Sequence, residues 1–470
     1  MGGTWSPTSP PSDPGFYVNF EAMATATVSG GQTGVVLIPL HDAVWGPVGT
    51  AQRFYSLAEY DRVFSKADTA GRRSVSNAFE ASGYRPGAAE VIAFRIDSET
   101  QSGSKSTASV AGLTLEAVYV GDFINGWEVA VSPPNPGTGD VSITLTDATN
   151  VVRWEGVFDD GDDGEVISNQ WFKATGTLAA AAVADSFVGG ANPDPTVDEV
   201  MAAVETNMLN NDFNVITTDD FDDATAPASG NIYAAIVGLT DDINLQGKRF
   251  LAVVGGAKDE SIDDAVAAAV AINNENIVRV GYTDLLDGDG NVVSTAEFAP
   301  KLAGIIASNG PFRSITANHI SGMRVSQKAT KADLRKARNA GVVMLVEDQI
   351  GARLYQDMTT FTMETMTKPR KEFGVIKAVM VHHQIENDLT RAAESGWIGG
   401  DNVNTDMYRR AVLDGIRTYL TRIEGAAMIQ PNWAVGLDDE YDNSGDSIHI
   451  KYGIKTTRVV ERILNTIVLH

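Results

Sequence analysis

Phe250-Leu251-Ala252-Val253-Val254 is an unbroken apolar run, and with the segments that follow it decides the fold class. The alanine-rich segment Ser261–Asn273 predicts a helix, and Ile277–Tyr282 is a second apolar run of strand length. A buried strand, a helix and another buried strand are typical of a βαβ unit in a parallel or mixed sheet. The sequence therefore predicts an α/β (mixed α+β) multidomain protein, with one αβ region with a mixed or parallel sheet at 191–372.

The same alternation occurs nearer the start of the chain. The apolar runs Gly34–Leu40 and Glu90–Ile96 predict buried strands, and Ser56-Leu57-Ala58-Glu59 begins a helix with a capping box. We expect residues 21–96 to be the first part of the αβ region.

Between these two regions the pattern changes to short strands joined by Gly, Ser and Thr. The expected strands are Ser109–Tyr119, Trp127–Ser132, Val141–Leu145 and Val151–Phe158. Because they are closely spaced and lack helical periodicity, they predict an inserted antiparallel β-rich outer domain at 97–190.

The two ends of the chain have the character of extended arms. Four prolines block a helix in residues 1–20, which we interpret as an N-terminal assembly arm. Residues 373–470 form a C-terminal core domain with two amphipathic helices, and 461–470 is its last strand. Strands at chain ends lack hydrogen-bond partners and are suited to pairing with another subunit. The side chains expected to make these inter-subunit contacts are Phe16, Tyr17, Val18, Phe20, Ile463, Ile467 and Leu469.

Composition excludes several classes of protein. The chain has no cysteine, so disulfides and thiol catalysis are impossible. No apolar run is long enough to cross a bilayer, so we expect no membrane insertion. A net charge of −25 argues against direct nucleic-acid binding. The charge is uneven, because residues 140–242 hold 20 acidic side chains against Arg153 and Lys173, whereas residues 313–377 are net basic.

Patterns that suggest catalysis or cofactor binding are weak. His382, His383 and Glu386 lie at helical spacing without an HExxH motif. The aspartates of 284–291 and of 159–165 do not match a calcium-binding loop. Gly255-Gly256 precedes a helix but belongs to no phosphate-binding motif. We therefore expect no catalytic residues, no cofactor and no metal site.

Two basic helices could contact an acidic partner. One begins near Thr330 and carries Lys331 and Arg335. The other, Thr405–Glu424, has an apolar stripe on one side and carries Arg410 and Arg417 on the opposite side. A solvated helix face is the simpler interpretation of the first helix.

The N-terminal sequence resembles that of a known family. Its motifs are Gly2-Gly3-Thr4-Trp5, Pro14–Phe20, Gly34–Leu40 and Trp45-Gly46-Pro47. Together they resemble the opening of contractile phage tail sheath proteins of the Bacillus defective-prophage type. Glu461–Leu469 is similar to the terminal strand of that family, whereas Tyr119–Gly126 departs from its "yPGxxGN" segment and the acidic middle matches poorly.

The resemblance implies a structural subunit that polymerises as stacked hexameric rings around a tail tube. The ends of the chain would form the inner layer, the inserted domains would lie outside, and the terminal arms would add strands to neighbouring subunits. The implied partners are further copies of the chain, the tail tube protein, and baseplate and tail terminator proteins. Arg410, Arg417, Lys331 and Arg335 are the candidates for contact with the tube. The implied location is the virion, after assembly in the host cytoplasm.

Two alternatives remain open at this stage. The first is the sheath of a phage-derived bacteriocin or of another contractile injection system, which sequence does not separate from a virion sheath. The second is an αβ enzyme with a β-insert, which would need a phosphate loop or a catalytic triad.

Overall fold

A computed structural model describes the chain in part. The described residues are 2–4, 16–18, 28, 33–40, 43–80, 86–179, 181–221, 232–281, 284–366, 368–399 and 402–458, with the backbone alone for 2–4 and 16–18. The chain divides into two compact units, one formed by Gln32–Gln384 with Arg458–His470 and the other by Met1–Gly31 with Ile385–Thr457. In the described ranges, no helix has the length and apolar character needed to span a membrane.

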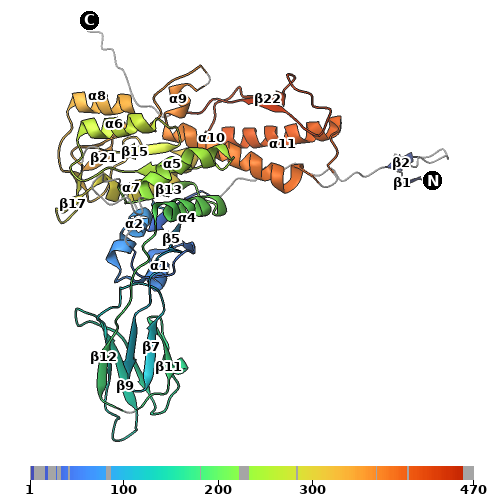
Figure 1. Cartoon of the computed structure of the whole chain (residues 1–470). Helices are drawn as coiled ribbons and strands as arrows, with labels where there is room; N and C mark the ends of the chain where they lie inside the picture. The colour runs from blue at the N-terminus through green and yellow to red at the C-terminus, as the bar shows by residue number, and fades with distance from the viewer. Residues whose placement is uncertain are drawn as a thin grey trace. The chain divides into compact units, whose positions relative to one another are not determined.

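The larger unit is built on a seven-stranded sheet (Figure 1). Every neighbouring pair in it is parallel except the pair at one edge, where β4 runs antiparallel to β5. Strands from both predicted αβ regions lie side by side in this one sheet. Its order is β19 (Val342–Val343), β15 (Ile277–Val280), β14 (Leu251–Val254), β13 (Val215–Thr217), β3 (Val35–Leu40), β5 (Glu90–Arg95) and β4 (Gln52–Phe54).

Helices cover both faces of the sheet. Along β3, Val36 and Ile38 point to the core that holds helices α2 (Thr69–Phe79) and α7 (Thr295–Asn309). Val35 and Leu37 point to the opposite core, with α4 (Val197–Asn210) and α5 (Ile232–Leu245). This alternation follows from the two-residue period of a strand, and burial on both faces explains why these strands are continuous apolar runs in the sequence.

A third core forms where α6 (Ile262–Ile272) and α8 (Lys331–Ala340) pack beside β19. The predicted βαβ unit is confirmed, because β14 and β15 pair in parallel and α6 connects them. Ser261 caps α6, and Thr330 with Asp333 forms a capping box on α8. Each cap satisfies backbone N–H groups that a helix start otherwise leaves unpaired.

The segment between β5 and α4 forms a separate β-lobe. One sheet has the order β10 (Val152–Phe158), β9 (Val141–Thr146), β8 (Glu128–Val131) and β12 (Val183–Ser186). The other has the order β11 (Phe172–Gly176), β7 (Leu113–Ala117) and β6 (Thr107–Val110). All strand pairs within the lobe are antiparallel, and the two sheets share one apolar core.

The prediction of a single strand over Ser109–Tyr119 is wrong. Ala111 and Gly112 both have positive φ angles, at 50° and 81°, and they turn the chain between β6 and β7. A two-residue turn of this kind needs left-handed backbone at both positions, which glycine accepts freely.

Short elements complete the larger unit. Ser56 caps α1 (Leu57–Tyr60), which continues as a π-helical turn, η1 (Asp61–Ser65). The others are α3 (Gly164–Ile167), η2 (Gly310–Phe312), α9 (Arg370–Phe373), and strands β16 (Leu285–Leu286), β17 (Val292–Val293), β18 (Arg324–Val325), β20 (Leu345–Glu347) and β21 (Ala352–Leu354).

The smaller unit contains the end of α10 (Ile376–Ala392), the π-helical turn η3 (Ala393–Trp397), and α11 (Asp406–Gly425). Two short strands, β22 (Ala434–Leu437) and β23 (Ile450–Gly453), form an antiparallel pair. The N-terminal strands β1 (Gly2–Thr4) and β2 (Phe16–Val18) pair with each other in parallel. The expectation that the Phe16 strand has no partner within the chain is therefore wrong, because its backbone pairs with Gly2–Thr4.

Candidate assembly surfaces

The long helix α11 has one buried face and one exposed, charged face. Val412, Ile416 and Tyr419 are buried, and the Tyr419 hydroxyl donates a 2.8 Å hydrogen bond to Asp388 on α10. Burial and the Asp388 carboxylate both raise the pKa of Tyr419, so the phenol remains a donor at any ordinary pH. This buried contact fixes the orientation of α11 about its own axis.

The opposite face of α11 presents the predicted cations. Arg410 and Arg417 are both exposed and lie seven residues apart, about two helical turns, so they point in similar directions. Arg417 forms a 2.7 Å ion pair with Asp414, whereas no ion pair joins Arg410 to another described residue. The charge that this face offers to a partner is therefore carried mainly by Arg410.

The second basic helix, α8, also exposes its predicted cations. Lys331 and Arg335 are one turn apart, and neither forms an ion pair with another described residue. Lys336 is different, because it contacts Asp263 on α6. Ala337 and Ala340 are buried and hold α8 against its neighbours.

Of the predicted arm residues, Phe16, Tyr17 and Val18 form β2, where only the backbone is described. Phe20, Ile463, Ile467 and Leu469 lie outside the described residues. Sequence reasoning did not anticipate that β22 and β23 form a sheet of only two strands, so that each has one edge without a described partner strand. Open edges of this kind accept a further strand by main-chain hydrogen bonding.

A groove of about 570 Å³ lies beside the β22–β23 pair within the smaller unit. Its apolar lining includes Trp397, Tyr408, Val412, Ile450 and Tyr452. The Tyr408 hydroxyl donates to the Trp397 carbonyl at 2.7 Å, which closes one wall.

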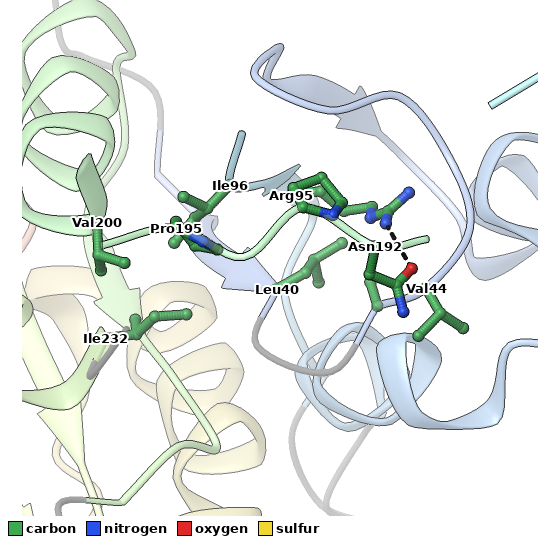
Figure 2. Close-up of a pocket in the computed structure, with 10 residues that line it drawn as sticks. Leu40, Val44, Arg95, Ile96, Asn192, Pro195, Val200 and Ile232 are labelled. Carbon is green, nitrogen blue, oxygen red and sulfur yellow. Dashed lines mark hydrogen bonds between the residues drawn. The ribbon is translucent and has the colours of Figure 1, made fainter. Parts of the chain in front are cut away.

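The seven-stranded sheet has a topological switch between β3 and β13, because the chain leaves β3 toward β5 on one side and later returns to β13 on the other. Enzymes with such sheets bind ligands in the crevice outside the carboxyl ends of the strands at the switch. In this protein, the chain's own residues occupy most of that crevice. A pocket of about 290 Å³ remains there, lined by Leu40, Arg95, Asn192, Pro195 and Ile232 (Figure 2).

Arg95 is the main polar group in that crevice, and it is used to hold the chain together. Its Nη1 donates to the carbonyls of Gly46 at 2.8 Å and Val120 at 3.2 Å, and its Nη2 lies 3.5 Å from the Asn192 amide oxygen. Burial lowers the pKa of Arg95 to about 10, and Asp68 opposes that shift. The guanidinium thus stays charged at neutral pH and links the segment after β3, a loop of the β-lobe and the connection by which the chain leaves the lobe.

Aromatic packing strengthens the same junction. Trp45 follows β3 yet is buried in the core of the lobe, with ring centroids 5.2 Å from Tyr119 and 5.5 Å from Trp171. Edge and offset aromatic contacts at these distances contribute about 0.5–1.5 kcal/mol each beyond their buried area. The lobe is therefore packed against the sheet and not merely tethered to it.

The Gly255-Gly256 turn is filled by protein. A Cβ at Gly255 would lie 2.0 Å from the Thr295 carbonyl oxygen, and the Gly256 N–H donates to the Thr295 hydroxyl at 2.8 Å. The start of α7 thus packs directly on this turn, in the position that a phosphate would need.

The candidate ligands for metals are also engaged with protein groups. His383 is buried and contacts the Asn276 amide oxygen at 2.9 Å, and burial lowers the pKa of His383 to about 3. His382 lies 3.9 Å from Glu372. Asp287 accepts hydrogen bonds from the N–H groups of Asp289 and Asn291 and closes the β16–β17 turn. Across the described ranges, no group of three or more His, Asp or Glu side chains is arranged to hold a metal ion.

Known proteins share this architecture. Residues 195–360 match the family model of the phage tail sheath protein central domain. Among solved structures, the sheath tail protein of Desulfitobacterium hafniense is 17% identical, with a TM-score of 0.72 over 94% of this chain and 100% of that one. The sheath tail protein Lin1278 of Listeria innocua is 17% identical, with a TM-score of 0.63 over 92% and 97%.

A further match is the sheath of an extracellular contractile injection system, PVC, in its contracted state, which is 13% identical with a TM-score of 0.59 over 98% of this chain and 99% of that one. No curated protein sequence matches the chain.

The fold is thus a doubly wound αβ body with an inserted β-lobe and a second unit formed by Met1–Gly31 and Ile385–Thr457. Residues 195–360 match the central-domain model of phage tail sheath proteins, and the fold of the chain is that of tail sheath proteins of phage-like contractile systems. The predicted relationship and the predicted mixed αβ fold are confirmed at this level.

Proposed function

We propose that this chain is the repeating subunit of a contractile tail sheath. Copies polymerise as stacked six-subunit rings around a tail tube, and the polymer shortens to drive the tube through a cell envelope. The observation that carries the proposal is the match of 195–360 to the sheath central domain, because these residues supply four strands of the central sheet and the helices around them. Electron microscopy of the purified protein tests the proposal. Striated tubes are expected, and a protein that stays monomeric with and without its tube protein would contradict it.

The chain ends provide the means of polymerisation. A strand from a neighbouring copy that pairs with the open edge of β22 or β23 adds several backbone hydrogen bonds, each contributing a net ~0.5–1.5 kcal/mol. Such a link tolerates rotation of the body it connects, because the main-chain hydrogen bonds of the added strand do not depend on how that body is oriented. We assign residues 1–20 and 461–470 to this role.

The exposed cations of α11 and α8 are our candidates for contact with the tube. Exposed ion pairs contribute only ~0–1 kcal/mol each, so a few of them hold a metastable sheath without preventing its release. Reversal of Arg410 is expected to weaken assembly on the tube more than reversal of Arg417, which Asp414 already compensates. If Arg410→Glu, Arg417→Glu, Lys331→Glu and Arg335→Glu together leave assembly unchanged between low and high salt, this contact is wrong.

The setting of the particle is a further part of the proposal. We place the subunit in the tail of a virion, assembled in the host cytoplasm, with a tube protein, a baseplate and a terminator as partners and genome ejection as its role. The sheath of a bacteriocin or an extracellular injection system is the alternative, and the likeness to the PVC sheath favours it to the same extent. Mass spectrometry of purified particles separates the two, because a virion contains capsid proteins and packaged DNA.

We also propose that the chain has no catalytic activity. The switch-point crevice is crossed by the chain's own segment 192–195, and Thr295 fills the Gly255-Gly256 turn. Titration calorimetry with nucleotides and divalent metals is expected to show no binding. Micromolar binding that disappears on changing Gly256 or His383 would overturn this view.

A further inference from the structure

The β-lobe is electrically polar along its length. Strand β10 runs from a basic cleft, where the lobe meets the body, to an acidic tip at the far end of the lobe. Its seven residues cover about 20 Å at the rise of a strand. The two ends are formed by residues from different elements, and they carry opposite charge.

The cleft has a volume of about 280 Å³. Its body side is the π-helical turn η1 and the residues after it, with Arg62 and Lys66, and its lobe side is the start of β10 with Arg153. The indoles of Trp45 and Trp171, 5.5 Å apart, also line it.

Two of the three cations in the cleft lack an ion-pair partner among the described residues. Arg153 is paired with Asp147 at 2.6 Å, and Asp61 is held in two contacts by Arg72 at 2.6 and 3.0 Å. Arg62 and Lys66 are exposed, and neither forms an ion pair with another described residue. The β10–β9 register shifts between Val152 and Trp154, so Arg153 lies at a bulge, a device that redirects a side chain.

The tip has the opposite character. Phe158 pairs with Val141 at the end of β10, and the loop that follows is pinned by hydrogen bonds between Gly161, Asp162 and Leu178. Asp159, Asp160 and Asp163 are exposed there, and the sequence holds no lysine or arginine from Trp154 to Phe172. Asp163 precedes α3 without capping it through its side chain.

We propose that the acidic tip of one copy docks in the basic cleft of a second copy. The inference rests on the proposed polymer, because it needs copies arranged head to tail. Two different patches, basic and acidic, at opposite ends of one strand form a heterologous contact, which builds a closed ring or an open helix depending on the rotation between copies. Carboxylates of the tip meet Arg62 and Lys66, whereas repulsion between the like-charged tips of two copies disfavours contact between those tips.

Cross-linking tests the contact directly, because the chain has no cysteine of its own. In polymerised protein, Lys66→Cys with Asp163→Cys is expected to give a ladder of disulfide-linked oligomers. Val270→Cys with Asp163→Cys is the control, since Val270 is exposed on α6, away from the cleft. A ladder with the control but not with the test pair would overturn the proposal. A disulfide that joins the Lys66→Cys variant to a different protein of the particle would also overturn it, in favour of that protein as the occupant of the cleft.

A charge swap gives an independent test. Arg62→Glu with Lys66→Glu, or Asp159→Lys with Asp163→Lys, is expected to raise the concentration needed for polymerisation about tenfold at low salt, equivalent to ~1.4 kcal/mol. The four changes combined restore near-normal assembly, because the charges are exchanged. Additive losses in the combination would overturn the proposal. If wild-type protein forms tubes but the swap and the cross-link both fail, only this contact is wrong; if wild-type protein forms no tubes with its tube protein, the proposed function fails too.

Discussion

Helices α2 and α7 lie so close together that one added methyl group tests how the body is packed. Gly304 lies in the middle of α7, and a Cβ added there would lie 2.1 Å from the carbonyl oxygen of Ala78 on α2. Real Cβ atoms essentially never approach another atom closer than 3.0 Å. Because interiors are close-packed, Gly304→Ala must move the two helices apart by roughly 1 Å. Overpacking of this kind costs about 1–3 kcal/mol and outweighs the gain of up to ~1 kcal/mol in helix propensity.

Gly238→Ala is the matched control. Gly238 lies within α5, is exposed, and has no atom within 4 Å of an added Cβ. Only the propensity gain applies there, so this variant is expected to be more stable by about 0.5–1 kcal/mol. The two substitutions are chemically identical, and their expected effects on stability differ in sign.

Urea denaturation and amide hydrogen exchange measure both effects. Gly304→Ala is expected to lower the urea midpoint and to increase exchange in α7, whereas Gly238→Ala raises the midpoint. Equal stabilisation by both variants would show that α2 and α7 are not in close contact at Gly304. It would contradict the close packing of these helices in the body.

Three other predictions follow from particular groups. Burial raises the pKa of Asp357 from 3.8 to about 6, so its contribution to stability is present at acid pH and is lost as the pH rises through 6. In urea titrations at each pH, wild type should therefore lose up to ~3 kcal/mol between pH 4 and 7 relative to Asp357→Asn, because the other titrating groups, among them buried His383, are common to both proteins. Trp45→Ala removes an indole at the junction and is expected to destabilise the β-lobe by about 3–5 kcal/mol, seen as faster exchange in β7 and β11 with β14 unaffected; uniform loss across the unit would contradict a separate lobe. Deletion of residues 1–20 should leave the melting temperature nearly unchanged and abolish polymerisation, and normal striated tubes from the truncated protein would show that the arm does not link subunits.

Local signals made much of the body predictable. Thr330 with Asp333, and Ser56 with Glu59, mark helix starts because a short polar side chain accepts from the backbone N–H three residues on. The apolar runs of β3 and β14 identify strands because both of their faces are covered.

Two of the longer helices, α5 and α7, were not predicted, for a physical reason. Helix α7 contains Pro300 and Gly304, which helix propensity disfavours, yet nearly all of it is buried, so packing decides its conformation. Helix α5 is apolar on most of its surface and therefore lacks a clear helical period in its sequence.

Contacts between segments far apart in the chain could not be predicted from local sequence patterns. The cleft joins Arg62 and Lys66 to Arg153, and no spacing rule relates residues so far apart in the chain. One signal was available in the sequence. Arg153 is one of only two basic residues in 140–242, which indicates a specific contact for it. The pairing of β1 with β2 was missed for the same reason, because the Gly2–Thr4 strand is too short to recognise alone.

The proposed function requires that this chain form a sheath that exists in two lengths around a tube. Cryo-electron microscopy of particles that contain the protein, before and after triggering, tests it most directly. We expect an outer layer of six subunits per ring that is shorter and wider after triggering, with the subunits still joined through their chain ends. An outer layer of unchanged length, or particles in which this protein forms no continuous layer around the tube, would contradict it.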